Sequence, residues 1–199
     1  MRIAILGWGS LVWCPKGLQF HHAADGEGAY MGWFKDGCRL PIEFARISSK
    51  GQENERLTLV IWNPAMPVRV LWSESSLASL EEARENLRKR EGTDPAKIGY
   101  VVIATEERHS QFRGVLDPIE AWAREKNLDA VIWTDLESNF VERRGVESTE
   151  SSVVEYLRRS NATQAQRRAA VEYIRNAPPQ IQTTFRAVLE GTCEEFGTA

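Results

Sequence analysis

The chain has 199 residues, a formal net charge of −3 and an apolar fraction of 42%. This length suits one domain with or without an appendage, and the apolar fraction argues against general disorder. The small negative charge gives no electrostatic reason to expect a nucleic acid or an anionic membrane as a partner. No apolar run is long enough to cross a bilayer, and the N-terminal stretch is more typical of a buried strand than of a secretory signal.

The cysteines point to a reducing compartment. Cys14, Cys38 and Cys193 are scattered, odd in number and without CxxC spacing. Such a set predicts free thiols and hence a cytoplasmic protein. His21 and His22 do not have metal-ligand spacing relative to these cysteines, so we expect no bound metal.

The first part of the chain predicts strands and then a helix. Apolar or β-branched runs predict strands over residues 3–6, 40–47, 57–62 and 67–72. The first clear helix is predicted over residues 76–90, with Ser79 and Glu82 at capping spacing and Gly92 ending it. Four strands before the first helix favour much antiparallel pairing and an α+β fold.

The second part of the chain predicts further strands over residues 99–104 and 128–134. Asp117 and Pro118 have the residue types of an N-cap and first helical position, which predicts a helix from there to about Lys126. After Glu147, helices are predicted over residues 151–159, 162–175 and 183–189. We therefore expect a main domain over residues 1–145 and a helical extension over residues 146–199 packed on it.

A glycine-containing loop follows the first predicted strand, where Gly7 and Gly9 flank Trp8. Glycines there would allow positive φ and a close approach of backbone N–H groups to a ligand. A dinucleotide-binding fingerprint would need a small residue where Val12 stands and a helix directly afterwards. A nucleotide-dependent oxidoreductase is therefore a third-ranked hypothesis.

Two other interpretations of this loop are open. A nucleophilic Ser10 would require the pattern G-x-S-x-G, but Trp8 and Val12 occupy both glycine positions. The backbone N–H groups of Gly9, Ser10 and Leu11 could instead form a cradle for an anion or a carbonyl oxygen. The alternative is a tight turn with Trp8 filling the core.

Glu91 is the carboxylate most suggestive of chemistry. At 100° per residue it shares the apolar face of its predicted helix with Leu80 and Leu87, whereas Arg88 and Arg90 point elsewhere. Burial and the negative end of the helix dipole would both favour a protonated carboxyl group, which suits general acid–base catalysis. The alternative is a frayed last turn that leaves Glu91 in water or paired with Arg88.

Other side chains are weaker candidates. Arg46 and Glu43 lie on opposite faces of one predicted strand. Arg46 could reach a substrate carboxylate, and Glu43 is the second choice for a reactive carboxylate. Tyr100 opens a strand and could line the site. Asp135 and Glu137 are interpreted as solvated loop charges.

Several segments together resemble the γ-glutamylcyclotransferase-like family, which includes glutathione-degrading enzymes of the cation-transport-regulator type. WGSL at residues 8–11 resembles the family's Y-G-S-[LN] loop, and REGTDPAKIGYVV resembles the segment with its catalytic glutamate, here Glu91. LPIEFARIS followed by RLTLVIW, together with AVIWTDLESNF, is similar to a bacterial branch of this family. The similarity covers residues 3–140, and the C-terminal helices also look like that branch.

The resemblance implies a fold and a reaction. The fold would be a small mixed sheet, partly closed like a barrel, with helices around it. The enzyme would convert a small γ-glutamyl amide to 5-oxoproline and release an amine or amino acid, with Glu91 as general acid and base. No metal or organic cofactor would be needed, and a homodimer is left open. The substrate-binding residues would be Gly7, Trp8, Gly9, Ser10, Leu11, Arg46 and Tyr100.

Trp8 departs from the family pattern, because it replaces a tyrosine and lacks the hydroxyl group. A second hypothesis therefore retains the predicted pocket but assigns it no catalytic activity. In that case the protein would bind a small metabolite or a protein partner without catalysis.

Overall fold

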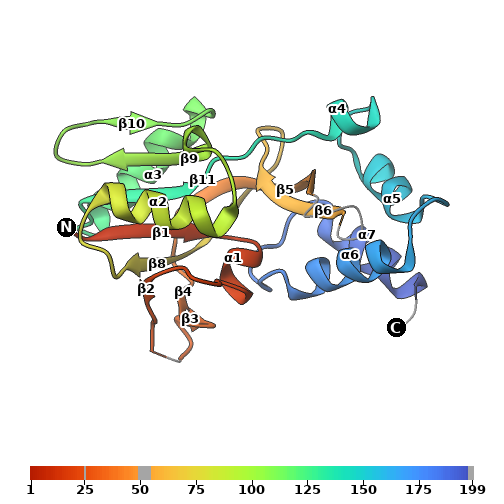
Figure 1. The fold of residues 1–199 in the computed structure, drawn as a ribbon, viewed down its shortest axis with the longest axis horizontal. Helices are drawn as coiled ribbons and strands as arrows, with labels where there is room; N and C mark the ends of the chain where they lie inside the picture. Colours follow the sequence, from red (N-terminus) through yellow and green to blue (C-terminus); the bar gives the residue numbers. More distant parts are fainter. Residues whose placement is uncertain (25, 49–54, 197–199) are drawn as a thin grey trace.

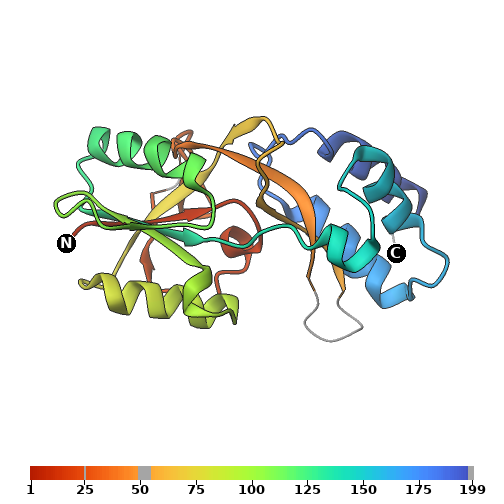
Figure 2. The ribbon, with the colours of Figure 1, turned by 90° about the horizontal axis from the view of Figure 1, so that it is seen from above.

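The computed structural model describes residues 1–24, 26–48 and 55–196. It is an α+β protein whose strands lie in a larger and a smaller sheet. In Figures 1 and 2 the larger sheet and its helices form one end of an elongated molecule, and the C-terminal helices form the other. Among the described residues neither sheet closes into a barrel, so the barrel-like closure implied by the resemblance is absent there.

The strand predicted over residues 3–6 is confirmed as β1 (Ile3–Gly7), which is buried along its whole length. It lies parallel to β11 (Ala130–Thr134) and antiparallel to β8 (Leu71–Ser75). The sheet continues beyond β11 with β9 (Ile98–Val102) and β10 (Arg108–His109), and beyond β8 with β4 (Trp33–Phe34) and β3 (Ala29–Tyr30), while β2 (Phe20–His21) also pairs with β8. An entirely apolar strand takes this position because both of its faces are covered.

Helices α2 (Leu80–Glu91) and α3 (Arg113–Glu125) lie on opposite faces of the larger sheet (Figure 2). The predicted capping pair is confirmed, since the Ser79 side chain accepts a hydrogen bond from the N–H of Glu82. This cap makes α2 begin later than predicted. Gly92 ends the helix in the left-handed region with φ 63°, as a helix-terminating glycine commonly does.

The predicted start of the second helix is wrong. α3 begins at Arg113 rather than after Asp117, and Pro118 lies inside it. Val115 and Leu116 are buried, so the apolar face of the helix extends before the proline. Asp117 is exposed and pairs with Arg108 instead of capping the helix.

The smaller sheet consists of β5 (Arg39–Ser48), β6 (Arg56–Ile61) and β7 (Pro67–Arg69), with β5 in the middle. The single strand predicted over residues 67–72 is divided between the two sheets. β7 pairs with β5, whereas β8, which begins at Leu71, pairs with β1. This change of partner joins the two sheets and fixes their relative position.

The C-terminal helices gather beside the smaller sheet (Figure 1). They are α4 (Phe140–Arg144), α5 (Glu150–Arg158), α6 (Gln164–Asn176) and α7 (Arg186–Glu195). Thr149 and Thr163 cap α5 and α6, each within a reciprocal capping box. α6 packs on β6, and its buried residues belong to the same apolar core as the larger sheet. Within the described residues, every helix is too short or too polar to span a bilayer.

Candidate functional site

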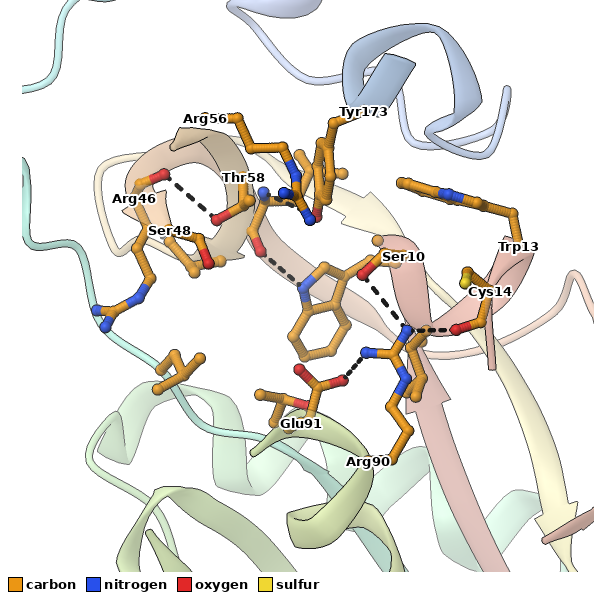
Figure 3. A pocket seen from close by; sticks show the side chains of 18 of the residues that line it. Ser10, Trp13, Cys14, Arg46, Ser48, Arg56, Thr58, Arg90, Glu91 and Tyr173 are labelled. Carbon is orange, nitrogen blue, oxygen red and sulfur yellow. Dashed lines mark hydrogen bonds and ion pairs between the residues drawn. The ribbon is translucent and has the colours of Figure 1, made fainter. Parts of the chain in front are cut away.

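A pocket of ≈ 430 Å³ lies where the two sheets meet the C-terminal helices (Figure 3). Its walls are formed by the loop after β1, the ends of α2 and β11, the paired strands β5 and β6, and helix α6. It therefore brings together the glycine loop of residues 7–11, Arg46 and Glu91, which the sequence predicted to form one site.

The glycines of the loop are required by close packing. A Cβ atom on Gly7 would lie 2.8 Å from Cζ3 of Trp33, and one on Gly9 would lie 2.4 Å from the hydroxyl oxygen of Tyr173. Neither glycine has a positive φ, and that of Gly9 is −124°. The close neighbour of Gly9 is thus a hydroxyl of this chain, and a close approach to a ligand stays a prediction. The freedom of these glycines to adopt a positive φ is not used.

Trp8 is both a core residue and a wall of the pocket. Its side chain is buried, and its indole N–H donates a hydrogen bond to the carbonyl oxygen of Leu59 at 3.3 Å. This bond holds the loop against β6. Because the N–H is used by the backbone, Trp8 presents only its apolar ring surface to a ligand.

Glu91 ends α2 and faces the pocket with a side chain that is 17% exposed. The last turn is not frayed, since the N–H of Gly92 donates to the carbonyl of Arg88 at 2.8 Å. Arg88 pairs with Glu85, not with Glu91. The carboxylate is instead 2.5 Å from Nη1 of Arg90.

The expectation that Arg90 points away from the site is wrong. Its side chain is only 7% exposed, and Nη2 donates hydrogen bonds to the carbonyl of Cys14 at 2.6 Å and to Oγ of Ser10 at 3.4 Å. Neighbouring helix residues diverge by about 100°, but the long arginine side chain can bend back toward the core. The guanidinium thereby connects the Glu91 carboxylate to the loop after β1.

Tyr173 of α6 is a pocket residue that the sequence did not single out. Its hydroxyl oxygen accepts a hydrogen bond from the N–H of Leu59 at 3.3 Å. Burial raises the pKa of Tyr173 to about 12, although the Leu59 N–H acts in the opposite direction. The phenol therefore keeps its proton at neutral pH. Helical periodicity places Tyr173 beside Ala170 and Ile174 on a buried face, but no pattern indicates that this face reaches a pocket.

Cationic side chains outnumber acidic ones around the pocket. Its lining includes Lys16, Arg46, Arg56 and Arg90 against Glu91 and Glu172. Arg46 follows an irregularity in the register of β5, and it donates a hydrogen bond to the carbonyl of Glu137 at 2.7 Å. The excess of positive charge favours an anionic ligand.

Tyr100 is not brought to this pocket, contrary to expectation. It pairs with Ile132 in the larger sheet, and its ring stacks on His109 with the ring centroids 6.0 Å apart. The guanidinium of Arg84 lies 4.1 Å from the centre of the Tyr100 ring. These contacts hold the Tyr100 ring outside the pocket that contains Glu91.

Two buried carboxylates outside the pocket have structural roles. Glu43 is fully buried and accepts hydrogen bonds from the N–H groups of Phe44 at 2.8 Å and Phe185 at 3.1 Å. Asp135 is also fully buried and accepts bonds from Ser110 and Trp133. The interpretation of Asp135 as a solvated charge is therefore wrong.

We expect Glu43→Leu to lower the free energy of unfolding by about 2–5 kcal/mol, because two buried N–H groups lose their acceptor. Burial raises the pKa of Glu43, so the folded state keeps this proton to a higher pH than the unfolded state does. The contribution is therefore complete below the unfolded pKa and declines as the pH rises above it. Glu43→Gln keeps only one of the two acceptor oxygens, so we expect a smaller loss than in Glu43→Leu, together with a flatter pH dependence. Urea unfolding from pH 4 to 8 measures both effects, and equal losses in the two variants would contradict this role.

The two other interpretations of the loop find little support. Helix α1 (Ser10–Trp13) is a single turn, so no helix of the length seen in dinucleotide folds follows β1. Ser10 has its hydroxyl 3.4 Å from Arg90, and the described lining of the pocket contains no histidine that could act as its base.

Comparison with known proteins finds no family model that matches the sequence and no curated protein with significant similarity to it.

Proposed function

We propose that this protein is a γ-glutamylcyclotransferase-like enzyme that converts a γ-glutamyl amide to 5-oxoproline and an amine or amino acid. The observation that carries the proposal is the convergence of a partly buried carboxylate, Glu91, and the loop of residues 7–11 in one cationic pocket. These groups are far apart in the sequence, and they are the ones that the resemblance to the family implicates.

The reaction is an intramolecular acyl transfer. The free α-amine of the γ-glutamyl group attacks its own γ-carbonyl carbon, and a C–N bond closes the five-membered ring. The original amide C–N bond then breaks. Glu91 accepts a proton from the attacking amine and returns it to the leaving nitrogen, so the carboxylate is regenerated. The pocket accelerates the reaction mainly by holding the substrate in the conformation that closes the ring.

Charge that develops on the γ-carbonyl oxygen needs hydrogen-bond donors. The N–H groups at the start of a helix have no acceptor within that helix, and Ser10 and Leu11 occupy such positions at the start of α1. In the proposal the N–H of Leu11 holds a substrate oxygen at the loop, whereas the backbone of Ser10 hydrogen-bonds with the Tyr173 hydroxyl. Arg46, on the β5 side of the pocket, is assigned to a substrate carboxylate.

A binding protein without turnover is the second candidate. The observation that favours it is the ion pair between Arg90 and Glu91, which occupies one carboxylate oxygen at 2.5 Å. If this pair persists with ligand bound, that oxygen is not free to accept the proton of the substrate amine. This candidate and the first share the pocket but differ in whether product forms.

The proposal is tested by 5-oxoproline release from γ-glutamyl amino acids and γ-glutamyl amines. The same compounds with an acetylated α-amine are the matched controls. We expect release only from the free amines, because the α-amine is the nucleophile. Cleavage of the amide bond in both the free and the acetylated compounds would indicate hydrolysis by water. Binding of the compounds without release of 5-oxoproline would favour the second candidate.

A further inference from the structure

Tyr173 reaches the glycine loop from a distant part of the chain. Helix α6 packs on β6 and directs this side chain toward Gly9, where an added Cβ would meet the hydroxyl oxygen at 2.4 Å. Figure 3 shows Tyr173 and Glu91 on opposite sides of the pocket. A ligand seated at the loop would therefore lie beside this hydroxyl as well as beside Glu91.

The ring of Tyr173 is held in place by its neighbours. Trp13 packs edge-on against it with centroids 5.0 Å apart, and Phe44 does so at 6.4 Å. The guanidinium of Arg56 lies 5.5 Å from the ring centre. The hydroxyl position is thus fixed by packing, as a preorganised hydrogen-bonding group requires.

The hydroxyl group of Tyr173 uses its oxygen as an acceptor and keeps its proton available to donate. Its oxygen accepts the N–H of Leu59, and the backbone of Ser10 also acts on it as a hydrogen-bond partner. A phenol has one proton to donate, and the acceptor sites on its oxygen are directed at these backbone groups. The O–H is therefore suited to donate to an oxygen in the pocket.

We propose that Tyr173 is a substrate-binding residue whose O–H donates a hydrogen bond to a carbonyl or carboxylate oxygen of the γ-glutamyl group at the Gly9–Leu11 loop. This inference rests on the proposed function. It implies that helix α6 completes the site, because it adds a donor from outside the loop and α2. It also supplies a hydroxyl at the loop where Trp8 has none.

Tyr173 acts in this proposal as a neutral donor and not as a base. Its pKa of about 12 means that the O–H is present throughout the pH range in which the protein would work. Removing it should therefore lower activity equally across pH 6–9 without changing the shape of the pH profile.

The test compares Tyr173→Phe with Tyr156→Phe. Tyr156 is a matched control because it is also a buried tyrosine of the C-terminal helices, and its hydroxyl donates to Glu55 rather than lining the pocket. Two quantities are measured for each variant. The first is kcat/KM for 5-oxoproline release from γ-glutamylglycine, and the second is the Kd for L-glutamate by calorimetry.

We expect Tyr173→Phe to lower kcat/KM by about 10²-fold and to weaken L-glutamate binding by about 10-fold, with both parameters of Tyr156→Phe near the wild type. Thermal unfolding of both variants shows whether they remain folded. Equal effects of the two substitutions, or no effect of Tyr173→Phe, would overturn the inference and leave cyclotransfer standing.

The binding measurement separates this inference from the proposed function. If the wild type binds L-glutamate but releases no 5-oxoproline, weaker binding by Tyr173→Phe still supports the hydrogen bond, and the cyclotransferase proposal alone fails. If the wild type neither binds L-glutamate nor releases product, both proposals are overturned.

Discussion

Glu91→Gln is expected to reduce 5-oxoproline release by about 10²–10⁴-fold, because glutamine cannot carry the proton from the α-amine to the leaving nitrogen. The substitution preserves the size of the side chain and one oxygen that can accept a hydrogen bond from Arg90. Initial rates with γ-glutamylglycine, measured beside substrate Kd, give this comparison. Substrate affinity should change far less than kcat.

Glu85→Gln is the matched control for this substitution. Glu85 lies on the same helix, but it is solvent-exposed and pairs with Arg88 and Lys89 rather than facing the pocket. Activity of this variant should equal that of the wild type. Substantial release by a folded Glu91→Gln variant would remove Glu91 from the mechanism.

Arg90→Met is the second substitution with a large expected effect. It leaves a mostly buried Glu91 without its cation and the carbonyl of Cys14 without its donor. We expect a loss of about 2–4 kcal/mol in the free energy of unfolding and a decrease of about 10-fold or more in kcat/KM. Urea unfolding and initial rates with γ-glutamylglycine measure the two effects.

Arg88→Met is the control, because Arg88 lies two residues earlier and pairs with the exposed Glu85. Both the stability and the rate of this variant should stay near those of the wild type. If Arg90→Met instead raises kcat, the ion pair restrains Glu91 rather than positioning it. That outcome would favour a protein selected for binding rather than for turnover.

Local signals predicted the parts of the fold and site that depend on neighbouring residues. The apolar run of β1, the Ser79 cap and the Gly92 terminus of α2 each follow from a few adjacent side chains. The same helical periodicity correctly placed Glu91 on the inward face. The glycine loop was singled out from its two glycines directly after a strand, and the structure gives close packing as the reason for both.

The remaining features depend on contacts between distant segments. Tyr173 reaches Gly9 only because α6 packs across β6, and nothing near Tyr173 in the sequence encodes that packing. Arg90 enters the site through the flexibility of its side chain, which a helical wheel does not represent. Asp135 is buried because its acceptor positions are filled by donors from other segments of the larger sheet and its loops.

The most direct test of cyclotransfer is to incubate the wild-type protein with γ-glutamylglycine in water enriched in ¹⁸O and to analyse the products by mass spectrometry. Attack by the α-amine predicts 5-oxoproline without ¹⁸O together with free glycine, and Glu91→Gln should form both far more slowly. Glutamate carrying ¹⁸O in its γ-carboxyl group would show that water is the nucleophile and would contradict the proposed reaction.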